Sequence, residues 1–310
     1  MVSKEVINDV ISKSIQTVIK CASSSRAKKL GATGVVEVKG NTKTITYDDG
    51  TVINLSVHDD MDDTVDGVSS GGRVYDYLGK DRVHKYFQYQ DDYLKKQKAE
   101  VNEFKAFNMR GGVMNHYEWE TEYDFVKSMV DSFATSFGMD INRKFIYGGE
   151  KLRHYTGESY FGSPIVPMDS DLHVNHLFEI ARNNRIDKSD LALVTYTRGF
   201  FQENNLDKLS YTKKGYTSTT AGGYDEDLQE NFKGTDGWTI ITTVKKDSNT
   251  RGLFFGNALK ESRTRFHDFY DWEAEVNLPP QTRFTRDIID EKNHIIVQHI
   301  VKQKGVEISE

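Results

Sequence analysis

The chain has 310 residues, of which 37% are hydrophobic and 12% aromatic, so it is long enough for one large domain or two smaller ones. Lys and Arg total 41 against 47 Asp and Glu, which gives a net charge of −6. This balance is unfavourable for non-specific DNA binding, which needs a basic surface. The many charged and aromatic residues together also exclude a wholly disordered chain.

The N-terminal segment has the pattern of an amphipathic helix over residues 4–22. Its branched apolar residues recur at helical spacing: Val6, Ile7, Val10, Ile11, Ile15, Val18 and Ile19. Acidic residues stand early in the segment, which argues against a signal peptide, and no run approaches the roughly 18 apolar residues of a membrane span. The single cysteine, Cys21, excludes an intrachain disulfide and a multi-cysteine zinc site. We expect a soluble protein that needs no oxidising compartment.

A β-hairpin is predicted next, because residues 34–40 and 43–57 alternate apolar and polar side chains around Asp48-Asp49-Gly50. The stretch 58–72 is acidic and rich in glycine. Its aspartates resemble those of a calcium loop, but the glutamate that ends such a loop is missing. We therefore interpret the stretch as a solvated linker, with a domain boundary near residue 70.

Helices and then strands are expected over the rest of the chain. Helical patterns cover residues 83–107, 122–137 and 171–184. After residue 190, short apolar strands are predicted within 191–200, 214–220, 237–246, 251–257, 272–278 and 294–303. This order predicts an α+β fold with segregated layers.

Three fragments of the strand-rich half could carry chemistry. Arg198 follows an apolar strand, Ser218 lies within Tyr216-Thr217-Ser218-Thr219-Thr220, and Glu273 and Glu275 begin a further strand. Each fragment alone has an ordinary explanation. An arginine at a strand end is usually a surface ion-pair partner, a Ser/Thr run reflects β-propensity, and a Glu-x-Glu pair is uninformative.

The glutamate pair gains meaning from its strand, because residues i and i+2 of an extended strand project from the same face. Two adjacent carboxylates repel, which raises the pKa of one of them. Such a pair suits a reaction through an oxocarbenium-like ribosyl cation, where one carboxylate stabilises the sugar and the other takes a proton. Arg198 would offer a planar cation to a phosphate, and the Ser218 hydroxyl could hold a carboxylate in one rotamer.

This order of residues resembles the R-S-E class of mono-ADP-ribosyltransferases, and is most similar to binary actin-modifying toxins and their bacterial and phage relatives. The resemblance covers roughly residues 115–310. It also rests on Tyr155 to Tyr160, on Gln202-Glu203 and on the segment WEAEVNLPPQTRF.

The resemblance implies an α+β fold: an ADP-ribosyltransferase-like core of two small perpendicular antiparallel or mixed β-sheets, flanked by N-terminal helices. In this class NAD lies in the cleft between the sheets, and no G-x-G-x-x-G fingerprint is needed. The chain would then divide into a helix-plus-hairpin module of unknown role (1–70), a helical linker (71–114) and an NAD-binding catalytic domain (115–310).

The resemblance also assigns roles. Arg198 is expected to contact the phosphate and ribose of NAD, and Gly199 the nicotinamide amide. Ser218 would orient Glu275, which binds the ribose 2′-hydroxyl and stabilises the oxocarbenium, while Glu273 positions and helps to deprotonate the acceptor. Further NAD contacts are expected from Thr219, Thr220, Tyr155, Tyr160, Gln202 and Glu203. No metal is expected.

Glutamate at position 273 implies arginine as the acceptor, because a carboxylate both binds a guanidinium and can take its proton. The segment 263–272 would recognise the target protein through Phe269, Tyr270 or Trp272, although Trp272 suits the core equally well. The predicted function is transfer of ADP-ribose from NAD to an arginine of a host or target protein, in the cytoplasm of the host or target cell. An NAD glycohydrolase and a non-catalytic structural or binding protein with the same fold stay open as alternatives; the charge and Glu273 disfavour DNA modification.

Overall fold

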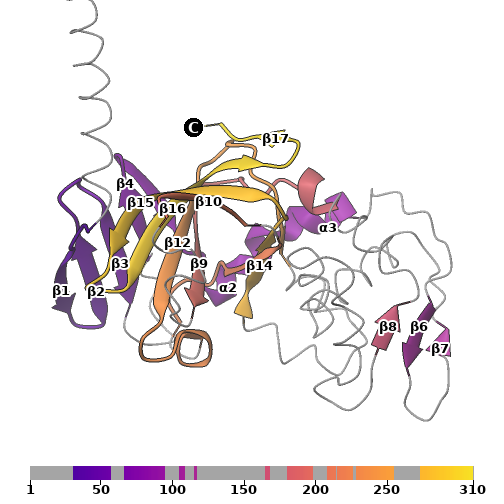
Figure 1. Ribbon diagram of the computed structural model, residues 1–310, viewed down its shortest axis with the longest axis horizontal. Helices are drawn as coiled ribbons and strands as arrows, with labels where there is room; N and C mark the ends of the chain where they lie inside the picture. Colours follow the sequence, from indigo (N-terminus) through magenta and orange to yellow (C-terminus); the bar gives the residue numbers. More distant parts are fainter. Residues whose placement is uncertain are drawn as a thin grey trace, which may run out of the picture.

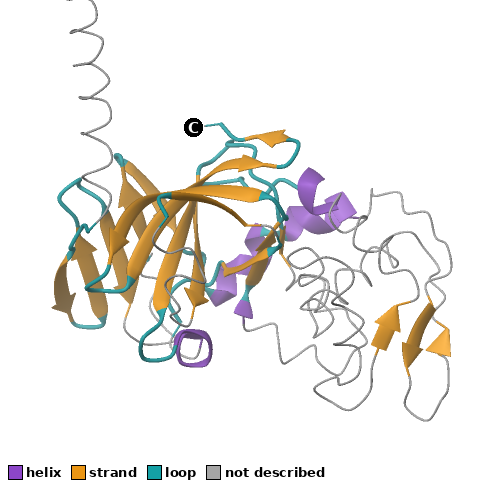
Figure 2. Cartoon of the chain, viewed as in Figure 1, coloured by secondary structure: helices purple, strands orange, loops and turns teal. Residues whose placement is uncertain are grey.

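The computed structural model describes residues 31–56, 66–94, 105–108, 115–116, 165–167, 180–197, 208–213, 215–225, 228–254 and 273–309. Within these ranges β-strands predominate and helices are few and short (Figures 1 and 2). The predicted helices over 4–22 and 122–137 lie outside the described residues. Of the predicted helix over 171–184 only residues 180–184 are described; residues 180–183 are helical and Asn184 is not.

The main sheet has ten strands along its path, in the order β1-β2-β3-β4-β5-β9-β12-β16-β15-β10. Neighbours are antiparallel except for the pairs β5–β9 and β12–β16, which are parallel. In that order the strands span Val35–Lys39, Thr42–Thr46, Val52–Ser56, Gly67–Ser70, Arg73–Asp76, Leu191–Thr197, Trp238–Val244, Ile295–Gln303, Thr282–Asp290 and Ser210–Lys213. β17 (Val306–Glu307) pairs with β16.

The predicted hairpin is confirmed as β2–β3, in which Thr46 lies opposite Val52. Its turn is closed by the hydrogen bond from Tyr47 N to Thr51 O at 2.9 Å, and Gly50 adopts the left-handed φ of 84° that the turn requires. A second hairpin, β4–β5, turns at Gly71-Gly72. The interpretation of 58–72 as a solvated linker is wrong in its last part, because Gly67–Ser70 form a strand paired with both β3 and β5. The boundary near residue 70 and the three-part division of the chain stay predictions.

A short strand group branches from β9. β11 (Thr217–Thr220) pairs with β14 (Glu275–Leu278), which pairs with β13 (Leu253–Phe254), and β11 meets β9 through the pair Thr220–Val194. Among the described residues this group is continuous with the main sheet, so the expected arrangement of two separate perpendicular sheets is not confirmed. A separate small sheet has the order β7-β6-β8, with β6 at Lys105–Asn108, β7 at Asn115–His116 and β8 at Ile165–Pro167.

The helix predicted over residues 83–107 is wrong at its C-terminal end. Two short helices, α2 (Lys80–Tyr86) and α3 (Gln88–Leu94), occupy the first part of that range, whereas β6 begins at Lys105. Phe107 of β6 pairs with Val166, a partner about sixty residues away. Such non-local pairing overrides local helix propensity, which is a weak preference.

Among the described residues, one hydrophobic cluster lies beneath β14 and against α2 and α3. Val276 and Leu278 are completely buried in it, and the ring of Phe87 stacks on that of Phe254 with centroids 4.8 Å apart. Because side chains alternate along a strand, the burial of Val276 and Leu278 directs Glu275 and Asn277 to the opposite face of β14.

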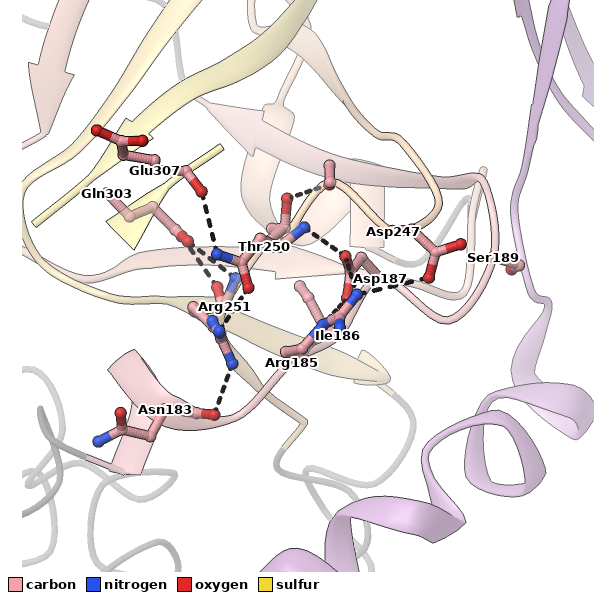
Figure 3. A network of polar contacts seen from close by, with 12 residues as sticks. Asn183, Arg185, Ile186, Asp187, Ser189, Asp247, Thr250, Arg251, Gln303 and Glu307 are labelled. Atoms are coloured by element: carbon pink, nitrogen blue, oxygen red, sulfur yellow. Dashed lines mark hydrogen bonds and ion pairs between the residues drawn. The ribbon is translucent and has the colours of Figure 1, made fainter. Parts of the chain in front are cut away.

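A polar network ties the start of β9 to the loop after β12 and to β16 (Figure 3). The buried carboxylate of Asp187 accepts two hydrogen bonds from Arg185, at 2.9 and 3.0 Å, and one from the backbone N–H of Asn249. Arg251 donates to the carbonyl of Asn183 and exchanges two hydrogen bonds with Gln303. The network therefore fixes the segments that lead into β9 and β13.

Candidate active site

The candidate site lies on the β11–β14 strand pair. In its register Ser218 is directly opposite Asn277, and Thr220 is opposite Glu275. Glu275 and Asn277 are two residues apart on the same strand and so share one face. Ser218 is exposed and Glu275 is partly exposed, so this face of the pair is open to small molecules.

Two side chains hold the Glu275 carboxylate. The hydroxyl of Ser218 donates to Oε1 at 2.6 Å, and the amide Nδ2 of Asn277 donates to the same oxygen at 2.7 Å. The structure thus brings together two residues that the sequence analysis selected, Ser218 and Glu275, from segments 57 residues apart.

Glu273 departs from the expected geometry. The Glu-x-Glu pattern predicts both glutamates in one extended strand, but β14 begins only at Glu275, and Glu273 lies in a 3₁₀ conformation. Between them Ala274 has a φ of 45°, in the left-handed region, and its carbonyl accepts a hydrogen bond from Ala221 N at 3.1 Å. The expectation of an extended Glu-x-Glu pair is therefore wrong, because the left-handed φ of Ala274 interrupts the extended backbone between the two acids.

The two carboxyl groups nevertheless interact. Burial, and secondly the neighbouring charge of Glu275, raise the pKa of Glu273 to about 7. Burial also raises the pKa of Glu275, while the hydrogen bonds from Ser218 and Asn277 oppose that shift. One carboxyl group is thus supported by two donors, and its neighbour can exchange a proton near neutral pH, a combination suited to acid–base chemistry.

The two threonines after Ser218 bond to the backbone. The hydroxyl of Thr219 donates to the carbonyl of Val276 at 2.7 Å, and that of Thr220 accepts from Gly222 N at 3.0 Å. Both side chains are buried. These contacts give Thr219 and Thr220 a part in holding β11 in place, and their predicted contacts with NAD stay predictions.

The other residues selected from the sequence lie outside the described residues. β9 ends at Thr197, the residue before Arg198, and the hydroxyl of Thr195 donates to the carbonyl of Ser218 at 3.0 Å. The end of β9 is therefore tied directly to the candidate site. The predicted site residues outside the described ranges are Arg198, Gly199, Tyr155, Tyr160, Gln202, Glu203, Phe269, Tyr270 and Trp272. Their roles stay predictions.

Asn277 was not selected from the sequence, although a signal for it was present. The i, i+2 argument that paired Glu273 with Glu275 applies equally to Glu275 and Asn277. The structure shows that this second pair is the one that keeps strand geometry.

Two further features concern the residues that the structure describes. No group of three or more His, Cys, Asp or Glu side chains is arranged there to hold a metal ion. No helix in that part of the chain is both long and apolar enough to cross a membrane.

The chain matches no known family model, and no curated protein sequence matches it. It is similar in structure to Plx2a, an ADP-ribosyltransferase toxin from Paenibacillus larvae, with 12% identity over 72% of this chain and 96% of that one and a TM-score of 0.45. The C3 exoenzyme of Clostridium limosum shows 12% identity over 73% and 96%, with a TM-score of 0.43. C3stau2 from S. aureus, solved with NAD, shows 15% identity over 57% and 92%, with a TM-score of 0.32.

Proposed function

We propose that this chain is a mono-ADP-ribosyltransferase, which moves ADP-ribose from NAD to an arginine side chain of a target protein and releases nicotinamide. The observation that carries the proposal is the carboxylate of Glu275, held by Ser218 and Asn277 beside a second carboxyl group with a pKa near 7. The proposal therefore rests on the residues of the site.

The chemistry follows from the charges. When the bond between nicotinamide and the ribose C1′ breaks, its electron pair leaves with nicotinamide and positive charge develops on the ribose. The ionised Glu275 carboxylate would stabilise that charge and accept a hydrogen bond from the ribose 2′-hydroxyl. Ser218 and Asn277 keep the carboxylate in one orientation, so little reorganisation is needed as the charge develops.

Glu273 would act on the acceptor. A guanidinium is protonated at neutral pH, so its nitrogen must lose a proton as it attacks C1′. A carboxylate with a pKa near 7 both attracts the cation and is a stronger base than an ordinary glutamate. This matching of charge supports arginine as the acceptor.

The remaining parts of the proposal rest on residues outside the described ranges. Arg198 and Gly199 would hold the phosphate and nicotinamide ends of NAD, and segment 263–272 would contact a target protein in the cytoplasm of a host or target cell. NAD is the substrate that these roles imply, with no metal required.

NAD glycohydrolysis is a second candidate, favoured by one observation. Ser218 is exposed and Glu275 is partly exposed, so water can reach the face on which the ribosyl cation would form. A non-catalytic protein is less well supported, because a second carboxyl group with a raised pKa beside Glu275 weakens the fold at neutral pH, and carboxyl groups with such shifts are typical of functional sites.

Labelled NAD and a cell lysate test the proposal. Wild type is expected to label a protein, and Glu275→Gln should label it at least about 100-fold more slowly. Glu273→Gln should lose transfer but keep some NAD hydrolysis, and the adduct should be sensitive to hydroxylamine if arginine is the acceptor. Glu291→Gln, at an exposed turn, is the matched control and should label normally. Equal labelling by all four proteins would refute the assigned roles, and NAD consumption without labelled protein would favour the glycohydrolase.

A further inference from the structure

Asn277 occupies an unfavourable place for an asparagine. It lies in the central strand of the β11–β14–β13 group, opposite Ser218 on one side and Leu253 on the other, and is 2% exposed. Asparagine is depleted in strands, and burying an amide is costly unless it is hydrogen-bonded. The 2.7 Å bond to Glu275 offsets this cost, which links the residue to the site.

The two donors to Glu275 converge on one atom. Ser218 Oγ and Asn277 Nδ2 both bond Oε1, and no described residue donates a hydrogen bond to Oε2. Donors from two neighbouring strands therefore hold this oxygen. Within the described part of the chain, Oε2 is the carboxylate oxygen that a ligand can contact.

The donors differ in rigidity. The Ser218 hydroxyl is exposed, so water competes for it and its hydrogen can rotate. The Asn277 amide is planar, buried and held in the middle of a strand group, so its N–H direction is set by the fold. An amide nitrogen only donates, and this contact therefore stabilises the ionised carboxylate.

We propose that Asn277 is a positioning residue: it fixes Oε1 of Glu275 so that Oε2 faces the ribose of the substrate. This inference rests on the proposed function and deepens it, because it assigns different tasks to the two oxygens of the carboxylate. Asn277 itself acts through Glu275.

The principal variant is Asn277→Leu, which keeps a similar volume but removes the donor. The expected result is a fall in kcat for NAD hydrolysis of about 10- to 100-fold, the effect of losing one hydrogen bond to a charged group, with the KM for NAD changed less than about two-fold. The acid limb of the pH profile should move to higher pH, because loss of the donor raises the pKa of Glu275.

A matched control separates positioning from damage to the sheet. Thr243→Val removes another buried hydrogen bond, from Thr243 Oγ1 to the carbonyl of Gln298 at 3.2 Å, in the β12–β16 pair. It should leave the pH profile unchanged. An active wild type together with an Asn277→Leu protein of unchanged kcat and pH profile would overturn the inference.

A measurement on the wild-type protein needs neither activity nor a folded variant. In an NMR titration, the side-chain amide of Asn277 should shift with the same midpoint as the carboxyl carbon of Glu275. An amide that does not respond to that titration contradicts the inference, whereas a wild type that responds but never consumes NAD contradicts the proposed function alone.

Discussion

Ser218 and Glu275 occupy diagonal positions on adjacent antiparallel strands, joined by a hydrogen bond of 2.6 Å. The residue directly opposite Ser218 is Asn277, so the longer glutamate side chain reaches across from two positions earlier along the strand. A one-residue slip in register would turn both Glu275 and Asn277 toward the core. The register of β11 against β14 therefore creates the site.

Removal of the serine hydroxyl should impair catalysis without unfolding the protein. Hydrogen bonds to charged groups are worth about 1.5–3 kcal/mol, so Ser218→Ala is expected to lower kcat for NAD hydrolysis by roughly 10- to 150-fold. Because Ser218 is exposed, the melting temperature should change by less than about 2 °C. Ser309→Ala, also exposed, serves as the control, and an unaltered kcat in Ser218→Ala would contradict the orienting role.

The rate of transfer to arginine should depend on Glu273. With a pKa of about 7, Glu273 loses its proton as the pH rises through neutrality, so transfer should increase over about pH 6–8 and then level off. The increase should be absent in Glu273→Gln. Residual transfer in that variant with a pH profile identical in shape to that of wild type would mean that another group supplies the base.

The same group should make stability depend on pH. The pKa of Glu273 is raised in the folded state from 4.5 to about 7, so the folded protein holds the proton more tightly and loses stability as the pH rises through that window. Glu273→Gln avoids this loss. At pH 8 it should be more stable than wild type by roughly 1–2 kcal/mol, after allowance for solvent screening of a partly exposed group. Near pH 4 the free energies of unfolding of the two proteins should converge. Urea unfolding at pH 4 and pH 8 measures both values, with Glu291→Gln as the control.

The alternation of apolar and polar residues predicted the strands that form the site. Two other features, the backbone of Ala274 and the strand over Thr282–Asp290, have no such local pattern. Val276 and Leu278 mark β14 as half-buried, whereas alanine gives no indication of the left-handed φ at Ala274. The strand over Thr282–Asp290 was not predicted either. There Arg286 is completely buried over the ring of Tyr211, at 4.4 Å from its centroid, so a charged residue occupies a core-facing position and breaks the apolar pattern.

The pairing of β11 with β14 could not be derived from either segment alone, because it joins residues 57 positions apart. The contact between Ser218 and Glu275 is instead predicted from the resemblance of their motifs to the ADP-ribosyltransferase family. Asn277 belongs to no such motif; strand alternation places it on the same face as Glu275, and the structure adds the hydrogen bond between the two.

The left-handed backbone at Ala274 should tolerate glycine but not valine. Ala274→Gly relieves a left-handed penalty of about 1 kcal/mol but loses a buried methyl group of similar value, so stability should change by less than about 1 kcal/mol. Ala274→Val adds a β-branched side chain at a buried position whose backbone is already in a strained conformation. It should cost about 2–3 kcal/mol and displace Glu273, lowering transfer. Thermal unfolding of the two variants checks this, and a valine variant as stable as the glycine one would contradict it.

The side chain of Gln90 bonds the backbone of β13 and takes the place of a neighbouring strand. Gln90 of α3 accepts from Phe254 N at 2.8 Å and donates to Phe254 O at 2.7 Å, and its oxygen also accepts from the Asn184 amide at 3.0 Å. Gln90→Leu keeps the volume but leaves these buried groups without their partner, which should cost about 2–4 kcal/mol in urea unfolding.

Because β13 supports β14, Gln90→Leu should also reduce hydrogen-exchange protection of the β14 amides at Val276 and Asn277. Gln88→Leu, at an exposed position in the same helix, is the control and should change neither quantity. If both variants had the same urea midpoint as wild type, Gln90 would not close the strand edge. A stability loss without a change in β14 protection would instead show that α3 and the site strand unfold independently.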